Sequence, residues 1–336
     1  MGAGVDYLGG GGTLGRTGYN EQGLNAQKKR EKVSAALLFI AVPLTLFITF
    51  RFLGSAKFMV AGLLIVVYAM IPFFMIFERR KPKAREIVLV AMMTALTVTA
   101  HLLFHVTIPI EIGTAMVIIS GISLGPEAGF LVGALARFVC NFYQGSGPYT
   151  PWQMFSWGLL GFLAGLAFNK VEAQHLRLQS QKEADARAAA VERPKEKTFR
   201  LVMGPLLCIV FGFLAAYISY LIVPGEDQTP WGWRMYVCGG AGLLLGAVLQ
   251  RKRLPVDNIT ITLFTFFTTL IIYGGIMNAA MLTWTGGDFN TLRLLYISGF
   301  IYDLGHAGRA AICMFVIGKP MMQKIERIKV KYGIYC

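Results

Sequence analysis

The feature that most constrains this chain is a succession of apolar segments, most of them long enough to cross a membrane. A helix needs about 20 predominantly apolar residues to span the hydrocarbon core of a bilayer. Repeated segments of this length predict an all-α polytopic membrane protein. We expect about ten membrane segments, at 33–50, 57–77, 86–108, 110–124, 126–143, 151–168, 201–222, 234–249, 258–284 and 292–317.

The distribution of basic residues predicts how these segments are oriented. With the N-terminus in the cytoplasm, 26 of the 32 Lys and Arg residues lie on the cytoplasmic side and four lie outside. This asymmetry follows the positive-inside rule and predicts that both termini are cytoplasmic. The net charge of +14 then indicates attraction to anionic lipid headgroups rather than binding to nucleic acid.

Two pairs of segments are plainer than the others, because their spans hold few polar residues. We interpret these pairs as additional transmembrane hairpins around a six-helix core. The predicted division is a disordered Gly-rich tail (1–32), an N-terminal hairpin (33–83), four core helices (84–168), a charged cytoplasmic loop (169–200), a second hairpin (201–257), and two core helices with a basic tail (258–336).

The uncharged stretch NFYQGSGPYTPWQMFSWG, residues 141–158, interrupts the apolar pattern on the predicted outer side. Thr150, Pro151 and Gln153 predict a helix start with a capping box. Neutral amides beside aromatic rings suit a flat, heteroatom-rich ligand of low net charge. An alternative is that the two tryptophans only anchor the helix at the membrane interface. The ligand-binding candidates from this stretch are Asn141, Tyr143, Gln144, Trp152, Gln153 and Trp157.

Four stretches resemble the substrate-binding S components of energy-coupling factor (ECF) vitamin transporters. They are EIVLVAMMTALTVTAHLLF, GISLGPEAGFLVGALARFVCNFYQGSGPYTPWQMFSWGLLGFLAGLAF, IIYGGIMNAAMLTW and ISGFIYDLGHAGRAAICMFVIGKPMMQKIERIKVKYGIYC. The resemblance covers about residues 84–168 and 258–336. The pattern GxGPYTPWQM is the more specific part of it.

This resemblance implies a bacterial cell-membrane protein that captures a vitamin or vitamin precursor, first of all a cobalamin-type compound. It also implies partners, namely a transmembrane coupling protein and two ATPase subunits. Ala91 and Ala95 match the family's small-residue motif and would face the coupling protein. The chain contains no GxxxxGK[ST] motif, which agrees with energy supplied by separate ATPases. We expect no enzymatic activity, no cofactor and no metal.

Ionisable and polar groups inside the spans complete the candidate ligand site, because such groups usually face a cavity or a partner. Asp303 and His306 lie on one side of the last helix, and Asp303 is expected either to contact ligand or to pair with Arg137 or Arg309. His105 and Asn278 are expected to face the same outer pocket. His101 and His105, with Glu111 nearby, offer only a weak metal-site pattern.

Two other functional classes remain open at this point. A stand-alone secondary transporter would often show inverted repeats, and no convincing repeat is visible. An integral-membrane enzyme would depend on Asp303 and His306, beside which the sequence places no serine or cysteine nucleophile. The cysteines form no CxxC pair and are interpreted as apolar filler.

The predicted orientation can be tested by labelling single cysteines in intact cells, with the native cysteines replaced. A cysteine at Ser146 should react with a membrane-impermeant maleimide, whereas one at Lys182 should react only after the cells are opened. Labelling of the Lys182 position in intact cells would overturn the orientation.

Overall fold

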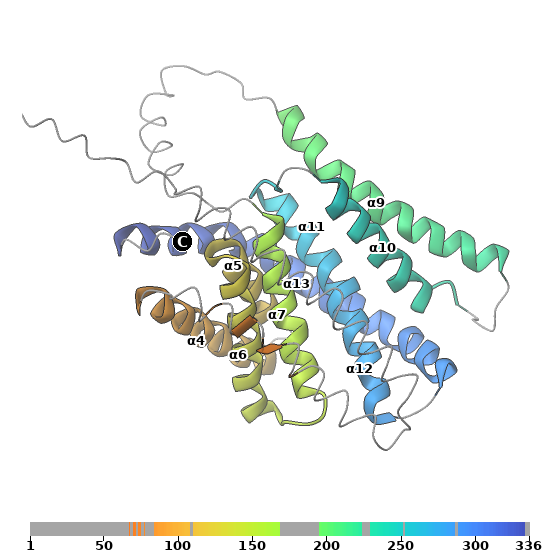
Figure 1. The fold of residues 1–336 in the computed structure, drawn as a ribbon, viewed down its shortest axis with the longest axis horizontal. Coiled ribbons are helices and arrows are strands. Elements are labelled where there is room, and N and C mark those ends of the chain that lie inside the picture. The colour runs from red at the N-terminus through yellow and green to blue at the C-terminus, as the bar shows by residue number, and fades with distance from the viewer. Residues whose placement is uncertain are drawn as a thin grey trace, which may run out of the picture.

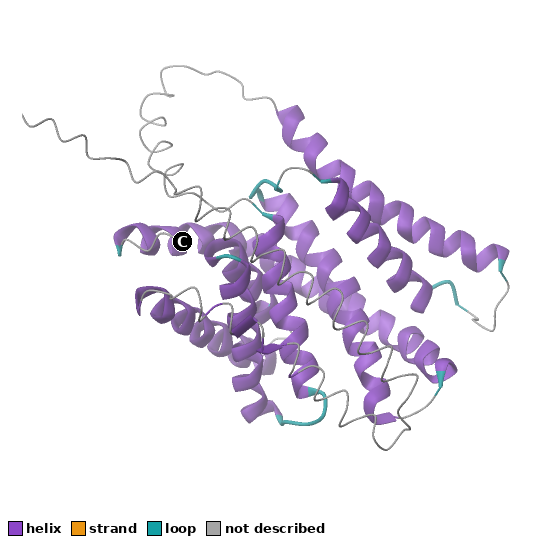
Figure 2. Cartoon of the chain, in the orientation of Figure 1, coloured by secondary structure: helices purple, strands orange, loops and turns teal. Residues whose placement is uncertain are grey.

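The computed structural model describes residues 84–107, 110–168, 195–223, 229–250, 253–285 and 288–332, with the single positions 67, 70, 71, 73, 74 and 77. These residues form helices and short connections, with one isolated bridge between Phe168 and Leu254 (Figure 2). The elements are α4 (Ala84–Thr107), α5 (Ile112–Leu124), α6 (Pro126–Gln144), α7 (Thr150–Ala167), α9 (Lys195–Ile222), α10 (Trp233–Leu249), α11 (Asn258–Thr268), η2 (Thr269–Gly274), α12 (Gly275–Thr285) and α13 (Phe289–Lys331).

An all-helical chain with membrane-spanning helices was predicted, and the structure agrees. Within its described part, four helices are long and apolar enough to cross a membrane, at Ala84–Phe104, Met203–Ile222, Asn258–Leu282 and Phe289–Lys329. The count of ten segments and the cytoplasmic termini stay predictions. The N-terminal tail and most of the 33–83 hairpin and the 169–200 loop lie outside the described residues.

Helices α5, α6 and α7 form a tightly packed unit because glycines line their contacts. A side-chain carbon at Gly121 would overlap the carbonyl of Gly161, and one at Gly129 would stand 2.5 Å from the Gly121 Cα. A side-chain carbon at Gly165 would likewise overlap the backbone of Pro126. The backbones therefore touch directly, as small residues four apart permit.

The turn between α5 and α6 follows from its Gly-Pro sequence. Gly125 has a φ of 102°, which side-chain-bearing residues rarely adopt, and Pro126 opens α6 where its missing N–H is not needed. Nearly every residue of α5 is buried, so this short helix lies inside the bundle.

The predicted 258–284 span is one helical rod with a change of winding in its middle. Asp257 caps the start, because its carboxylate accepts from the Thr260 backbone N–H at 2.9 Å and from the Thr260 hydroxyl at 2.6 Å. A π-helical turn, η2, then separates α11 from α12. Such turns are rare and occur mostly as insertions within α-helices.

The last helix is much longer than the predicted 292–317 segment. Asp288 precedes α13, and hydrogen bonds from the Thr291 backbone hold the pKa of Asp288 below its usual value. At the other end, Lys329 is buried and its Nζ donates to the Ser123 carbonyl at 2.9 Å and to Glu326 at 3.0 Å. These contacts fix residues that the sequence assigned to a basic tail.

Helices α9 and α10 form an antiparallel pair beside the core (Figure 1). Backbone contact between them is close, because a side-chain carbon at Gly212 or Gly242 would overlap the carbonyl of Cys238 or Cys208. Of this pair, α10 contacts η2 and α13. The two helices occupy the region of the second predicted hairpin, whose role as an additional transmembrane unit stays a prediction.

The glycine contacts of the α5–α7 unit should dominate its stability. We expect Gly161→Ala to destabilise the protein by about 1–3 kcal/mol through overpacking. Gly308→Ala is the matched control, since no atom lies within 4 Å of a side-chain carbon there. It should be neutral or slightly stabilising, because Ala favours a helix over Gly. Thermal unfolding of the two variants in detergent is the measurement, and equal melting temperatures would contradict the prediction.

Candidate ligand-binding site

A group of polar side chains from α4, α6 and α7 converges around Arg137, and we call it the Arg137 cluster. The Gln153 Oε1 accepts from the Arg137 Nε at 3.0 Å and from the Asn141 Nδ2 at 3.1 Å. The His101 Nε2 lies 3.3 Å from both the Arg137 Nη1 and the Gln144 Nε2. Because both neighbours are donors, the His101 Nε2 acts as the acceptor and its proton resides on Nδ1.

The Trp157 ring packs against Arg137 and His101 of the Arg137 cluster. The Arg137 guanidinium carbon lies 5.2 Å from the centre of the Trp157 ring, within the range of a cation–π contact. The His101 ring meets Trp157 edge to face, with centroids 5.0 Å apart. The indole Nε1 of Trp157 and the Oδ1 of Asn141 are buried without a hydrogen-bond partner. A buried polar atom without a partner is costly, so these two atoms offer binding positions to a ligand or a water.

The charge of the Arg137 cluster is not balanced by an acid. In the described part of the chain, no carboxylate lies within 4.0 Å of the Arg137 guanidinium, whose neighbours are neutral. A cation in a membrane helix usually faces a partner or a cavity. The arrangement therefore suits a ligand that presents carbonyl or anionic oxygens.

A second polar group, the Glu111 cluster, joins α5 to α13. Glu111 is 4% exposed and directly precedes α5. Its carboxylate lies 3.5 Å from the His306 Nε2 and 3.8 Å from the Arg309 Nη2. The hydroxyl of Thr114 is 3.3 Å from the same His306 nitrogen. The Tyr273 ring stands edge to face on His306, with centroids 4.8 Å apart.

The two clusters meet at the start of α5. A side-chain carbon at Gly113 would lie 2.8 Å from both the His101 Nδ1 and the Trp157 ring, so only glycine fits between Glu111 and the Arg137 cluster. Tyr273 lies within electrostatic reach of Arg137 and Glu111. One continuous polar region thus extends from α4 to α13 around the α5 terminus.

Comparison with protein families gives a decisive match over part of this region. Residues 81–185 match the family model described as "ECF-type riboflavin transporter, S component". About a third of the chain is therefore similar to the S components of ECF transporters. Comparisons with curated proteins and with solved structures returned no match.

The matched S-component domain contains the whole Arg137 cluster, together with Glu111 and Thr114. The family is one of transporter subunits rather than of enzymes, which agrees with the prediction of a non-enzymatic protein. A vitamin-binding subunit of a membrane transporter is therefore supported, as the sequence resemblance implied. Helices α9 to α13 lie outside the matched residues.

Asp303 does not pair with either arginine in the structure. Its Oδ2 accepts from the Tyr236 hydroxyl at 2.5 Å and from the Asn278 Nδ2 at 2.7 Å. Gly274 and Gly299 make room for this group, since a side-chain carbon at either would collide with Asp303 or Asn278. The expected Asp303–Arg pair is wrong because Tyr236, from the α9–α10 pair, supplies the hydrogen bond instead.

Several other predicted site residues take places that the sequence did not suggest. Trp152 is 1% exposed and packs in an apolar group with Phe130 and Phe155, away from Arg137. Tyr143 is 76% exposed and points outward. His105 lies in α4, but its side chain is outside the described residues. Asn278 and His306 are buried, as expected of pocket-lining groups.

The predicted capping box at α7 is wrong. Tyr149 occupies the capping position without a side-chain bond, and the Thr150 Oγ1 accepts from the Gly147 backbone N–H at 3.0 Å. The Gln153 side chain turns to α6 because Arg137 and Asn141 offer two donors there. Gln153 therefore belongs to the candidate site because it bonds to α6, and not because it caps α7.

Sequence reasoning missed Thr114, Tyr236 and Tyr273, and it considered Glu111 only as a metal ligand. Glu111 carried a usable signal, since a lone acid at the start of a fully apolar helix implies a buried partner. Tyr236 carried none, because its contact with Asp303 depends on how α10 docks. Among the described residues, no group of three His, Cys, Asp or Glu side chains is placed to hold a metal ion.

Proposed function

We propose that this protein is the substrate-capture subunit of an ECF-type, ATP-driven importer, and that the Arg137 and Glu111 clusters hold its vitamin substrate. The observation that carries the proposal is an arginine inside the S-component domain with no carboxylate partner among the described residues. Its surroundings offer an aromatic face, neutral amides and two unpaired buried polar atoms. Such a mixture of apolar walls and a few polar groups is typical of small-molecule sites.

The substrate that fits these groups is a water-soluble vitamin with a flat, nitrogen-containing ring and several carbonyl oxygens. Riboflavin, which the matched family's description names, has this chemistry, and we propose it as the first ligand to test. Its ring carbonyls would accept from Arg137, and its ring face would stack on aromatic side chains. A cobalamin-type compound stays a competing prediction.

The ligand role of the Arg137 cluster can be tested by equilibrium titration of purified protein with riboflavin, followed by flavin fluorescence. We expect Arg137→Gln and Gln153→Ala each to weaken binding by at least about tenfold. Loss of a buried hydrogen bond costs roughly 1–3 kcal/mol, which corresponds to about 5- to 150-fold in the dissociation constant.

Tyr143→Ala is the matched control from the same helix as Arg137, and it should leave affinity unchanged because the ring is exposed. Trp152→Ala should lower thermal stability rather than affinity, since this ring is part of the core. Binding of cobalamin to the purified wild-type protein is then measured separately. Equal riboflavin affinity in wild type and both cluster variants would contradict the ligand role, and binding of cobalamin without binding of riboflavin would contradict the choice of substrate.

We also propose that α4 is the surface that meets the coupling protein. Ala91 and Ala95 are exposed one turn apart on this helix, with Val88 and Met92 exposed beside them. Small side chains let another helix approach closely, which is how membrane helices associate in the absence of a hydrophobic drive. Two ATPase subunits would supply the energy through that coupling protein, in the bacterial cell membrane.

Docking at α4 predicts a specific loss of assembly. Ala91→Trp and Ala95→Trp should reduce co-purification with the coupling protein and ATPases, while riboflavin affinity of the isolated subunit stays at the wild-type value. Ala215→Trp, at an exposed alanine of α9, is the matched control and should assemble normally. Normal assembly of both α4 variants would refute the surface without affecting the ligand site.

The geometry gives little support to the two competing functional classes, an integral-membrane enzyme and a stand-alone secondary transporter. Asp303 bonds to Tyr236 and Asn278, whereas His306 faces Glu111 and Thr114, so the two residues contact different groups. An enzyme built on an Asp303–His306 pair would need them directed at one reacting atom. Co-purification with ATPase subunits separates the importer from a stand-alone secondary transporter.

A further inference from the structure

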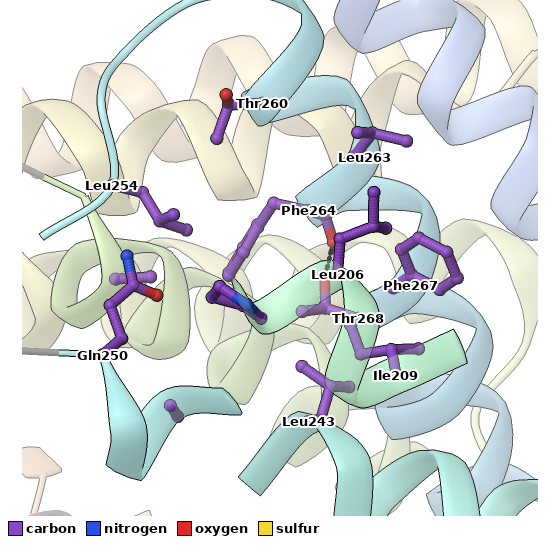
Figure 3. A pocket seen from close by; sticks show the side chains of 13 residues that line it. Leu206, Ile209, Leu243, Gln250, Leu254, Thr260, Leu263, Phe264, Phe267 and Thr268 are labelled. Carbon is purple, nitrogen blue, oxygen red and sulfur yellow. Dashed lines mark hydrogen bonds between the residues drawn. The ribbon is translucent and has the colours of Figure 1, made fainter. Parts of the chain in front are cut away.

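An apolar groove separates the α9–α10 pair from the core, and no ligand role has been assigned to it. Two adjoining cavities of about 460 Å³ and about 100 Å³ share Ala167, Leu243, Ala247, Gln250, Phe264 and Thr268 in their walls, and we call them together the hairpin groove. Figure 3 shows Leu206, Leu243 and Phe264 around its interior and Gln250 at one edge. Binding sites for small molecules commonly measure about 300–1,000 Å³.

The apolar and the polar residues that line the hairpin groove lie in different parts of it. Its interior is lined by aliphatic and aromatic side chains, and the Thr268 hydroxyl is already bonded to the Phe264 carbonyl at 2.7 Å. Besides Thr260 and Thr268, the polar residues that line it are Gln250 and Arg253, which follow the end of α10. The groove thus has an apolar length and a polar, basic mouth.

The mouth of the hairpin groove carries one unsatisfied donor. The Gln250 Nε2 is buried and has no hydrogen-bond partner. Arg253 also lines the groove. The nearby Asp257 carboxylate is engaged as the cap of α11, through two bonds to Thr260. Donor and basic groups at this mouth therefore favour an anionic oxygen group.

The length of the hairpin groove matches one leaflet of a bilayer. Its lining extends along the α11–η2 rod from Thr260 to Ile272, which at 1.5 Å per residue is about 18 Å. Half of a hydrocarbon core is about 15 Å thick. Its mouth lies in the segment 250–257, which the charge distribution predicts to be cytoplasmic.

From these observations we propose that the hairpin groove is a binding site for one anionic phospholipid, with an acyl chain between α7, α10 and α11 and its phosphate at Gln250 and Arg253. Basic pockets between membrane helices at the cytoplasmic surface are known to recognise anionic headgroups. The site is separate from the vitamin site, because no residue of the Arg137 or Glu111 cluster lines it.

The test is native mass spectrometry of the purified full chain, titrated with phosphatidylglycerol or phosphatidylcholine carrying identical palmitoyl-oleoyl chains. Wild type should retain one phosphatidylglycerol in preference to phosphatidylcholine. Arg253→Gln should reduce that preference by about fivefold, the effect of one basic group near an anionic lipid. Arg327→Gln, an exposed arginine of α13, removes the same charge elsewhere and should leave the preference intact.

A second pair of variants tests the acyl-chain position. Ala247→Phe should fill the groove and abolish retention of both lipids, whereas Ala215→Phe on the exposed face of α9 should not. Both alanines are exposed, so neither replacement should prevent folding. Equal retention of the two lipids by wild type would overturn the proposal. An unchanged lipid preference in Arg253→Gln, together with unchanged lipid retention in Ala247→Phe, would also overturn it. A loss of riboflavin affinity in Ala247→Phe, with lipid retention unchanged, would assign the groove to the vitamin instead.

Discussion

The arrangement of this protein depends on direct backbone contact among α5, α6 and α7. Gly121, Gly129 and Gly161 leave no room for side chains, so the three helices approach more closely than larger residues allow. This approach puts Arg137 of α6 opposite Gln153 of α7, and it brings the start of α5 against His101. A polar site inside an apolar bundle needs its members held in fixed positions, because each unsatisfied group there costs free energy.

Polar contacts then link this rigid unit to the elements outside the matched domain. Glu111 contacts His306 and Arg309 of α13, and Asp303 of the same helix bonds to Tyr236 of α10. A chain of buried polar groups therefore extends from the S-component domain to the additional α9–α10 pair. The hairpin is attached to the same helix that lines the proposed vitamin site, rather than being an independent appendage.

The sequence predicted most helix positions well because their limits are local. The α6 start is set by Gly125 and Pro126 next to it, and the predicted 126–143 segment agrees with Pro126–Gln144. The site was harder to predict. Gln153 of α7 bonds to Arg137 of α6, whereas the neighbouring Trp152 packs in the core. The extension of α13 was missed because Lys329 looks like a solvated charge, whereas its partner Ser123 is distant in sequence. Tertiary docking, which no local pattern encodes, decided each of these cases.

The continuity of α13 has a mechanical consequence. Asp303, His306 and Arg309 share one helix with Lys329, which lies about 39 Å beyond Asp303 and about 30 Å beyond Arg309 at 1.5 Å per residue. A rotation of this rod about its axis would change the Glu111 contact and the Ser123 contact at the same time. Pro320 lies between the Glu111 contact and the Ser123 contact. It has no backbone N–H and therefore removes one hydrogen bond of the helix. The helix thus contacts α5 at both of its ends, through Glu111 before its first residue and through Ser123 in its last turn, and holds the two ends in one register.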